Sequence, residues 1–315
     1  SSAASDVYKR QVIRRVAKKR HLPVVDLYAL LKPHPDYYTD GIHPNEQGAA
    51  LIAGELYRTL TGNEAPKIVT EQPFPGKKSQ WEGFDRYDFI CNARKATVVV
   101  PRKVAEGHPW IWRPAFFGAF PSVDKALLEK GFHVVYYDLT HLYGSPRAQR
   151  LGTDFYDIMR RYYRLSSKVT LEGFSRGGLF AFNWGAKNPD KVACIYVDAP
   201  VCDVFSWPGR HRELWSGLLA EWGLTDEQMN NFKGNPIDNL EPLADAGIPV
   251  ISVCGDSDRT VPYEENMKIV ADRYRALGGL VEIILKPGCD HHPHSLENPE
   301  AVVDFIVRNQ PDYQK

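Results

Sequence analysis

The residues best placed to do chemistry in this chain are one serine, a few aspartates and a run of histidines. Ser175 lies at the centre of the pattern G-x-S-x-G, formed by residues 173–177. A serine hydroxyl is a weak nucleophile at neutral pH, so it needs a histidine that takes its proton and a carboxylate that orients the histidine. Aspartates and histidines follow Ser175 in that order along the chain. These residue types predict acyl transfer through a covalent intermediate.

The sequence around Ser175 indicates a strand, a sharp turn and a helix. A β-branched run begins at Val169, and residues 179–184 have the spacing of a buried helix. A turn this tight needs small neighbours, and it lifts the serine hydroxyl clear of the strand's end. The amide of Arg176 would then lie at a helix N-terminus, where it can stabilise an oxyanion. The alternative is an ordinary strand-to-helix turn with an exposed serine.

Strand and helix patterns alternate from about residue 81 onward. Buried strands are expected at 109–116, 132–139, 192–200, 248–258 and 280–288, and two short strands around 84–93 and 96–102 are expected at an antiparallel edge. With helices of 10 to 18 residues between the strands, the pattern predicts an α/β fold, a mostly parallel sheet of about eight strands flanked by helices. The serine turn, an aspartate loop and a histidine loop follow in order, and residues 81–315 therefore resemble the α/β-hydrolase superfamily of serine esterases and peptidases.

Two aspartates compete for the role of the acid. The pattern G-x-x-D-x-x-V-P over residues 255–262 is similar to the acid loop of many members of this superfamily, and the resemblance implies that Asp258 is the acid. Asp256 remains the alternative. Only one of two carboxylates that stand two residues apart can face the imidazole.

Three histidines, His291, His292 and His294, follow the last predicted strand. Related sequences read G-x-G-H-H-P-H here, which implies that His291 is the base. His294 is expected to fix the loop. Asp290 replaces the usual glycine, so His292 stays open as an alternative. The cluster is also a possible metal site, but no second group of ligands accompanies it in the sequence, and we expect neither a metal nor an organic cofactor.

The second oxyanion amide is expected near the strand at 109–116. Trp112 or Arg113 is the candidate, and Arg113 is also a candidate to meet a substrate's carboxylate or hydroxyl groups. The aromatic residues around them are more typical of a core than of a sugar platform: Trp110, Phe116, Phe117 and Phe120.

Residues 202–246 interrupt the alternation. They contain three tryptophans, Trp207, Trp215 and Trp222, and a capping box at Thr225 and Gln228. In α/β-hydrolases a cap over the active site is inserted at this point, so the resemblance implies a small helical cap that shapes the substrate pocket. The alternative is that the tryptophans only pack small helices onto the body.

Residues 12–62 carry a second resemblance. Asp40 and His43 belong to a D-x-x-H-P-N pattern that precedes an amphipathic helix, and this resembles the last block of the SGNH (GDSL) hydrolases. In that family the Asp and His complete a triad with a serine near the domain's start, which is missing here. We therefore expect an inactive remnant, and an accidental surface pattern is the alternative. Residues 63–80 are expected to be a linker, and residues 1–11 resemble translated adapter sequence and are expected to be a non-native leader.

Composition narrows the class of partner. Thirty-nine basic and 39 acidic residues balance, which argues against nucleic acid or an anionic membrane as a partner. No apolar run approaches the roughly 18 to 20 residues of a membrane span. The five cysteines are scattered without C-x-x-C spacing, which argues against a zinc site or a disulfide framework.

The expected function is that of a serine hydrolase that cleaves carboxylic esters of small molecules or polysaccharides. The SGNH resemblance favours a carbohydrate esterase, acting on acetyl or feruloyl groups, and such an enzyme would be secreted or periplasmic. A serine peptidase of the prolyl oligopeptidase type is the enzymatic alternative. A binding module on an inactive hydrolase scaffold is the third.

Overall fold

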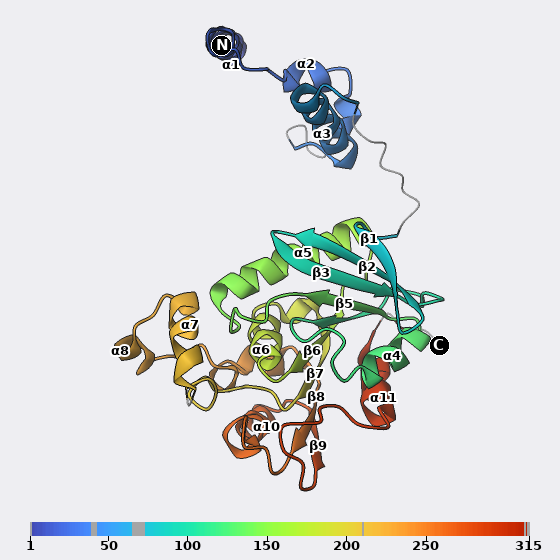
Figure 1. Ribbon diagram of the computed structural model, residues 1–315, viewed down its shortest axis with the longest axis vertical. Coiled ribbons are helices and arrows are strands. Elements are labelled where there is room, and N and C mark those ends of the chain that lie inside the picture. Colours follow the sequence, from blue (N-terminus) through green and yellow to red (C-terminus); the bar gives the residue numbers. More distant parts are fainter. Residues whose placement is uncertain (1, 39–42, 65–72, 210, 312, 314–315) are drawn as a thin grey trace. The chain divides into compact units, whose positions relative to one another are not determined.

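The computed structural model describes residues 2–38, 43–64, 73–209, 211–311 and 313 (Figure 1). The chain separates into two compact units, Ser1–Gln72 and Pro73–Lys315. Among the described residues, no helix is both long enough and apolar enough to cross a membrane.

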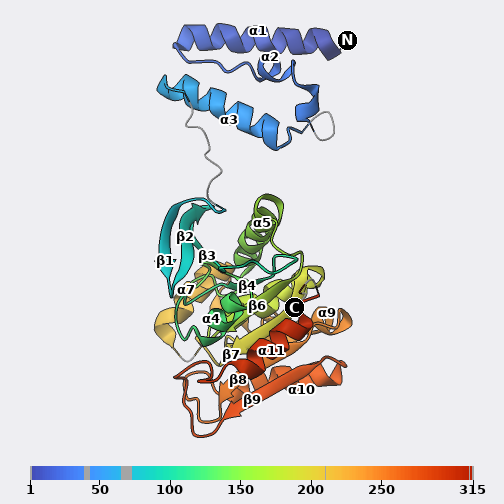
Figure 2. The same cartoon turned by 90° about the vertical axis from the view of Figure 1, so that its right-hand side faces the viewer.

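The N-terminal unit is helical (Figure 2). It contains α1 (Ser2–Arg20), α2 (Leu27–Leu31) and α3 (Glu46–Thr61), and α3 is the amphipathic helix expected from the sequence. Asn45 caps α3 by accepting a hydrogen bond from the amide of Gly48, and the helix ends at Gly62 with φ of 72°. The helix α1 includes most of the expected leader, because its Ala, Lys, Arg and Gln residues favour a helix without an apolar face. Asp40 lies outside the described residues, and the SGNH resemblance stays a prediction.

The second unit is built on a nine-stranded sheet with the order β1-β2-β3-β5-β4-β6-β7-β8-β9. The strands β1, β2, β3 and β5 pair antiparallel, whereas β5, β4, β6, β7, β8 and β9 pair parallel. The strands are β1 (Lys77–Trp81), β2 (Phe84–Cys91), β3 (Arg94–Val100), β4 (Trp110–Arg113), β5 (His133–Tyr137), β6 (Val169–Phe174), β7 (Val192–Asp198), β8 (Val250–Gly255) and β9 (Val281–Lys286). The predicted α/β class is confirmed. The expected linker ends earlier than residue 80, because β1 begins at Lys77 and Phe74 is already buried.

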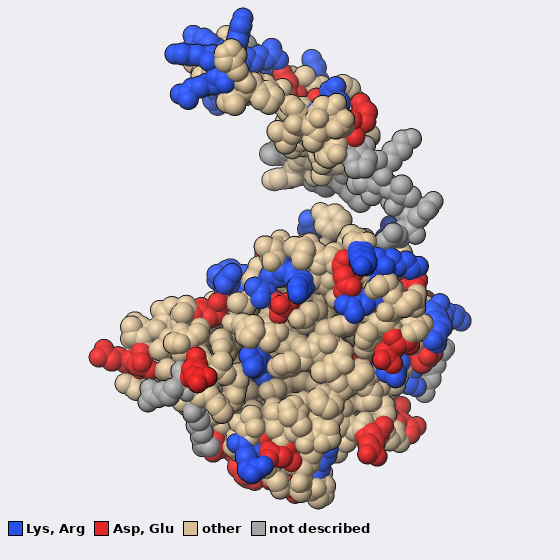
Figure 3. All heavy atoms as spheres, in the orientation of Figure 1, with Lys and Arg blue, Asp and Glu red and all other residues tan. Residues whose placement is uncertain are grey.

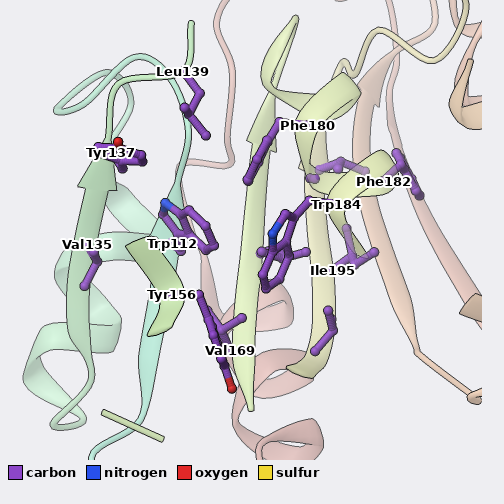
Figure 4. Packing of buried hydrophobic residues seen from close by; sticks show 14 of the residues in the cluster. Trp112, Val135, Tyr137, Leu139, Tyr156, Val169, Phe180, Phe182, Trp184 and Ile195 are labelled. Atoms are coloured by element: carbon purple, nitrogen blue, oxygen red, sulfur yellow. The ribbon is translucent and has the colours of Figure 1, made fainter. Parts of the chain in front are cut away.

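Helices cover both faces of this sheet (Figure 1). The helices α5 (Pro146–Tyr163), α6 (Gly177–Lys187) and α10 (Met267–Ala276) pack on one face, and α4 (Ser122–Glu129) and α11 (Glu300–Asn309) pack together on the other. Large aromatic rings fill the space between the sheet and the helices α5 and α6. There the Trp112 ring lies 5.1 Å from the rings of both Phe180 and Trp184 (Figure 4). Burial of this kind is the main stabilising contribution to the fold.

A helical segment, called the cap below, follows β7 at the place where the sequence predicts a cap. It contains α7 (Arg212–Trp222), α8 (Asp226–Met229) and α9 (Glu241–Asp245), and the predicted capping box at Thr225 is present. Its apolar side chains form a separate cluster that includes Trp207, Leu218 and Phe232. The same cluster includes Leu179 of α6 and Tyr143, so it packs the cap onto the body of the unit.

Charged side chains of both signs are interspersed over the visible face of the second unit, and Lys and Arg gather on α1 (Figure 3). The overall balance of charge does not reveal this basic helix.

Candidate active site

Ser175 occupies a strained turn between β6 and α6. Its φ is 49°, a left-handed value that side-chain-bearing residues seldom adopt and that is common at functional sites. The Ser175 amide donates to the carbonyl oxygen of Asp198 at 2.9 Å, and its carbonyl oxygen accepts from Gly178 at 3.0 Å. A side chain at Gly178 would lie 2.5 Å from Pro200, so this close approach requires glycine. The local sequence thus folds into the expected strand, turn and helix.

Ser175, His291 and Asp258 form one chain of hydrogen bonds. Nε2 of His291 lies 3.1 Å from Oγ of Ser175, and Nδ1 of His291 lies 2.7 Å from Oδ2 of Asp258. The second Asp258 oxygen accepts from the amides of Thr260 and Val261, both at 2.8 Å. A carboxylate beside Nδ1 fixes the tautomer in which Nδ1–H donates to Asp258 and Nε2 accepts from the serine hydroxyl. The three side chains have the geometry that general-base activation of a serine requires.

The two alternative residues do not join this chain. Asp256 is exposed, and its carboxylate accepts from the amide of Gly288 at 2.8 Å and from the hydroxyl of Ser257 at 2.9 Å. His292 is exposed and stacks on the ring of Phe120 at 5.8 Å. Asp256 therefore ties two loops together, and His292 borders the site.

Asp290, the residue that replaces the usual glycine, connects the acid loop to the histidine loop. Its carboxylate accepts from the backbone amides of Arg259, at 2.9 Å, and of His291, at 2.8 Å. These amides and the Arg259 guanidinium lower the pKa of Asp290 to about 2. The substitution thus leaves His291, the first histidine of the loop, beside Ser175.

A second aspartate–histidine pair lies next to the first. Nδ1 of His294 is 2.6 Å from Oδ1 of Asp198, and the other Asp198 oxygen accepts from the amide of Ser295 at 2.7 Å. His294 fixes the loop, as expected. Asp198 was missed, and the signal that points to it is a carboxylate at the carboxyl end of a buried strand beside the serine turn.

The expected role of Trp112 as an oxyanion donor is wrong. Trp112 lies within β4, between Val135 on one neighbouring strand and Leu171 on the other, and it is fully buried. The strand continues through Arg113, so the backbone of Trp112 lies inside the sheet and not in the loop that borders the pocket. The loop that begins at Pro114 brings Phe116 to the pocket. Within the described residues, no hydrogen-bond acceptor contacts the amide of Phe116 or that of Arg176.

Arg113 does not reach substrate either. It is 1% exposed, and its guanidinium pairs with Asp124 and, at 3.4 Å, with Glu172. Burial raises the pKa of the Glu172 carboxyl well above its ordinary value. The side chain of Arg113 is therefore part of a buried charge cluster beneath the pocket.

The serine opens into a small pocket of about 280 Å³. Its walls are aromatic and basic, formed by Phe116, Phe120, Phe174, Trp207, Arg176 and the three histidines. A hollow of about 600 Å³ borders the same loop at Lys286 and Glu297, but its lining does not include Ser175. The smaller pocket therefore holds the reactive groups.

The three histidines are the group of described residues that could hold a metal ion, with ligand atoms within 4.8 Å of one another. Zinc–nitrogen bonds of about 2.0 to 2.1 Å place ligand atoms of a tetrahedral site roughly 3.3 Å apart, so the rings would have to move. Nδ1 of His291 is held by Asp258, so a metal would take the ring nitrogen that faces Ser175. Metal binding would thus compete with the serine for His291.

The sheet and the serine turn define a serine hydrolase with the α/β-hydrolase fold. Residues 152–309, which include Ser175, Asp258 and His291, match the model of the prolyl oligopeptidase family, and the chain belongs to this family. No curated protein sequence matches the chain.

Solved structures share the fold at low sequence identity. Pyrococcus horikoshii acylaminoacyl peptidase has a TM-score of 0.55 at 14% identity, over 74% of this chain and 43% of that one. The S-formylglutathione hydrolase from Agrobacterium tumefaciens has a TM-score of 0.53 at 13% identity, over 73% of this chain and 94% of that one. Porphyromonas gingivalis dipeptidyl peptidase 4 has a TM-score of 0.54 at 12% identity, over 73% of this chain and 36% of that one. The chain thus spans less than half the length of the two peptidases.

Proposed function

We propose that the protein is a serine peptidase that cleaves small, peptide-like substrates with Ser175 as nucleophile, His291 as base and Asp258 as the acid that orients it. The observation that carries this proposal is the chain of hydrogen bonds from Asp258 through His291 to Ser175, which lies within the segment that matches the prolyl oligopeptidase family.

The reaction follows from the positions of the atoms. Nε2 of His291 takes the proton of Ser175 as Oγ attacks the substrate's carbonyl carbon. The amides of Arg176 and Phe116 donate to the oxyanion, and Nε2–H then gives its proton to the leaving group. Water attacks the acyl-enzyme by the same route and releases the acid. Asp258 stays ionised throughout and holds the imidazolium that forms.

The size of the pocket supports a small substrate. A volume of about 280 Å³ is just below the usual range for ligand pockets, and it accommodates one or two residues of a peptide. The peptidase neighbours named above support the amide bond only by analogy of fold.

A carboxylic ester is the second candidate. It is favoured by the Agrobacterium hydrolase, whose fold this chain matches over 94% of that protein's length. The carbohydrate ester is no longer favoured, because it depended on the SGNH resemblance and no family match supports it.

A panel of substrates tests the proposal. We expect aminoacyl and dipeptidyl 4-nitroanilides to be hydrolysed above the Ser175→Ala background, with no loss of rate in EDTA. Hydrolysis of 4-nitrophenyl esters alone would favour the second candidate. Hydrolysis of acetylated xylan alone would favour the carbohydrate esterase that the sequence predicts. Because we propose that the N-terminal unit supplies no catalytic group, the Asp40→Ala/His43→Ala variant serves as the control and should keep its rate within about twofold.

A further inference from the structure

A cation lies in the pocket beside the nucleophile without a carboxylate partner. Arg176 follows Ser175 directly and lines the same pocket. Among the described residues it forms no ion pair. Its Nε atom is buried and without a hydrogen-bond partner, and one terminal nitrogen approaches Nδ1 of His141 at 3.5 Å. One donor of this guanidinium is therefore buried and unsatisfied, and no carboxylate of the described residues accepts from the others.

Two aromatic rings hold the guanidinium in place. Its central carbon lies 4.8 Å from the ring centre of Trp207 in the cap and 5.7 Å from that of Phe116. Aromatic faces attract the cation, but they do not accept hydrogen bonds from its N–H groups as a carboxylate does. The rings thus fix the position of Arg176 and leave its donors for another partner.

The described residues place no carboxylate in an ion pair with Arg176, although its charge lies in the pocket. None of the described residues that line the pocket is acidic. Burial lowers the pKa of Arg176, and Tyr143 is the neighbour that acts in the opposite direction. Arg113, by contrast, is fully buried and has Asp124 and Glu172 beside it. A half-buried cation with no carboxylate beside it favours a ligand that supplies the negative charge.

We propose that Arg176 forms an anion subsite and that the natural substrate carries a carboxylate, which binds the guanidinium while the scissile carbonyl lies at Ser175. A planar carboxylate fits the fork of an arginine through two parallel hydrogen bonds. The carboxylate belongs either to the acyl group or to the leaving group of the substrate. In both cases only a few bonds separate it from the scissile carbonyl. This proposal rests on the proposed role of Ser175.

Matched pairs of substrates test the subsite. Mono-4-nitrophenyl succinate and 4-nitrophenyl butyrate compare an acyl group with and without a carboxylate, and 4-carboxyphenyl acetate and phenyl acetate do so for the leaving group. We expect the wild type to prefer the acid in one pair by about 10- to 100-fold in kcat/KM. Arg176→Gln should abolish this preference, and Arg176→Lys should retain part of it. Arg147→Gln removes an equal charge outside the pocket and should keep the preference.

The outcomes separate the subsite from the catalytic proposal. A neutral ester that is hydrolysed without any preference for the acid, or a preference that survives Arg176→Gln, would overturn the subsite alone. Absence of any turnover would contradict the catalytic proposal, and the subsite is then tested by calorimetry with succinate and benzoate. Binding that Arg176→Gln weakens at least tenfold supports the subsite, and equal or undetectable binding in both proteins overturns it.

Discussion

Two aspartate–histidine pairs lie side by side in this molecule, and one of them has a serine. Nδ1 of His291 is 2.7 Å from Asp258, and Nδ1 of His294 is 2.6 Å from Asp198. Both pairs are buried, and the two imidazole rings are 4.8 Å apart. Nε2 of His291 faces Ser175 at 3.1 Å, whereas the described residues place no hydrogen-bonding group at Nε2 of His294.

The difference shows that the position of the nucleophile selects the catalytic pair. The serine turn places Ser175 beside His291, and the Asp198–His294 pair stabilises this arrangement. Asp198 accepts the Ser175 amide through its backbone and the Ser295 amide through its side chain, so it ties the serine turn to the histidine loop. We therefore expect loss of chemistry from changes in the first pair, and loss of position and stability from changes in the second.

The largest expected effect comes from removal of the base. His291→Ala should lower kcat/KM by about 10⁴-fold or more, because no other group takes the proton of Ser175. His292→Ala, in the same loop, should cost at most about tenfold, since His292 contacts neither Ser175 nor Asp258. Steady-state kinetics on one ester measures both. If the two variants exchanged their effects, the assignment of the base would be wrong.

The second-largest loss of activity is expected from a change of the acid, Asp258. Asp258→Asn should lower kcat by about 10⁴-fold, because the amide favours the wrong tautomer of His291. Asp256→Asn is the matched control, with the same chemical change two residues away, and should lose no more than about tenfold. Equal losses in the two variants would mean that the loop, rather than the hydrogen bond to His291, determines activity.

The second pair should show a different signature. Asp198→Asn should destabilise the fold by about 1 to 3 kcal/mol, because it disrupts a buried hydrogen-bonded pair that also holds the Ser295 amide. Denaturant unfolding measures this change. At temperatures where the variant remains folded, kcat should fall with little change in KM, since His291 loses its support. An unchanged free energy of unfolding would contradict the supporting role.

A third buried histidine, His133, has no aspartate partner among the described residues and shows how burial affects a histidine. His133 is 3% exposed, and burial lowers its pKa to about 4. The unfolded chain binds the proton near pH 6.5, so stability is complete above that value and decreases as the pH falls toward 4. This should cost on the order of 3 kcal/mol by pH 4. The difference in unfolding free energy between wild type and His133→Gln should shrink by that amount from pH 7 to pH 4, and parallel profiles would contradict it.

The sequence was sufficient for most of the fold because the buried parallel strands read as nearly continuous apolar runs. It was insufficient for β1, a polar edge strand that pairs only with β2 and has exposed or half-exposed residues throughout. The start of α1 was also missed, since its residues favour a helix by propensity alone and present no apolar period.

The sequence predicted those site residues that stand in short local motifs. Ser175, Asp258 and His291 each stand in a short motif, and the structure brings the three together. Trp112 was misplaced because its apolar neighbours do not show where a strand ends and a loop begins. Asp198 was missed because its partner His294 is 96 residues away, and pairing over that distance depends on the folded sheet.

Covalent labelling tests the central claim most directly, which is that the first pair activates Ser175. A fluorophosphonate probe should modify wild-type protein once, at the peptide that contains Ser175, and mass spectrometry identifies the site. The Ser175→Ala protein should remain unlabelled, and labelling should slow greatly in His291→Ala but persist in His292→Ala. Labelling at another residue, or labelling of Ser175 at an undiminished rate without His291, would contradict the account.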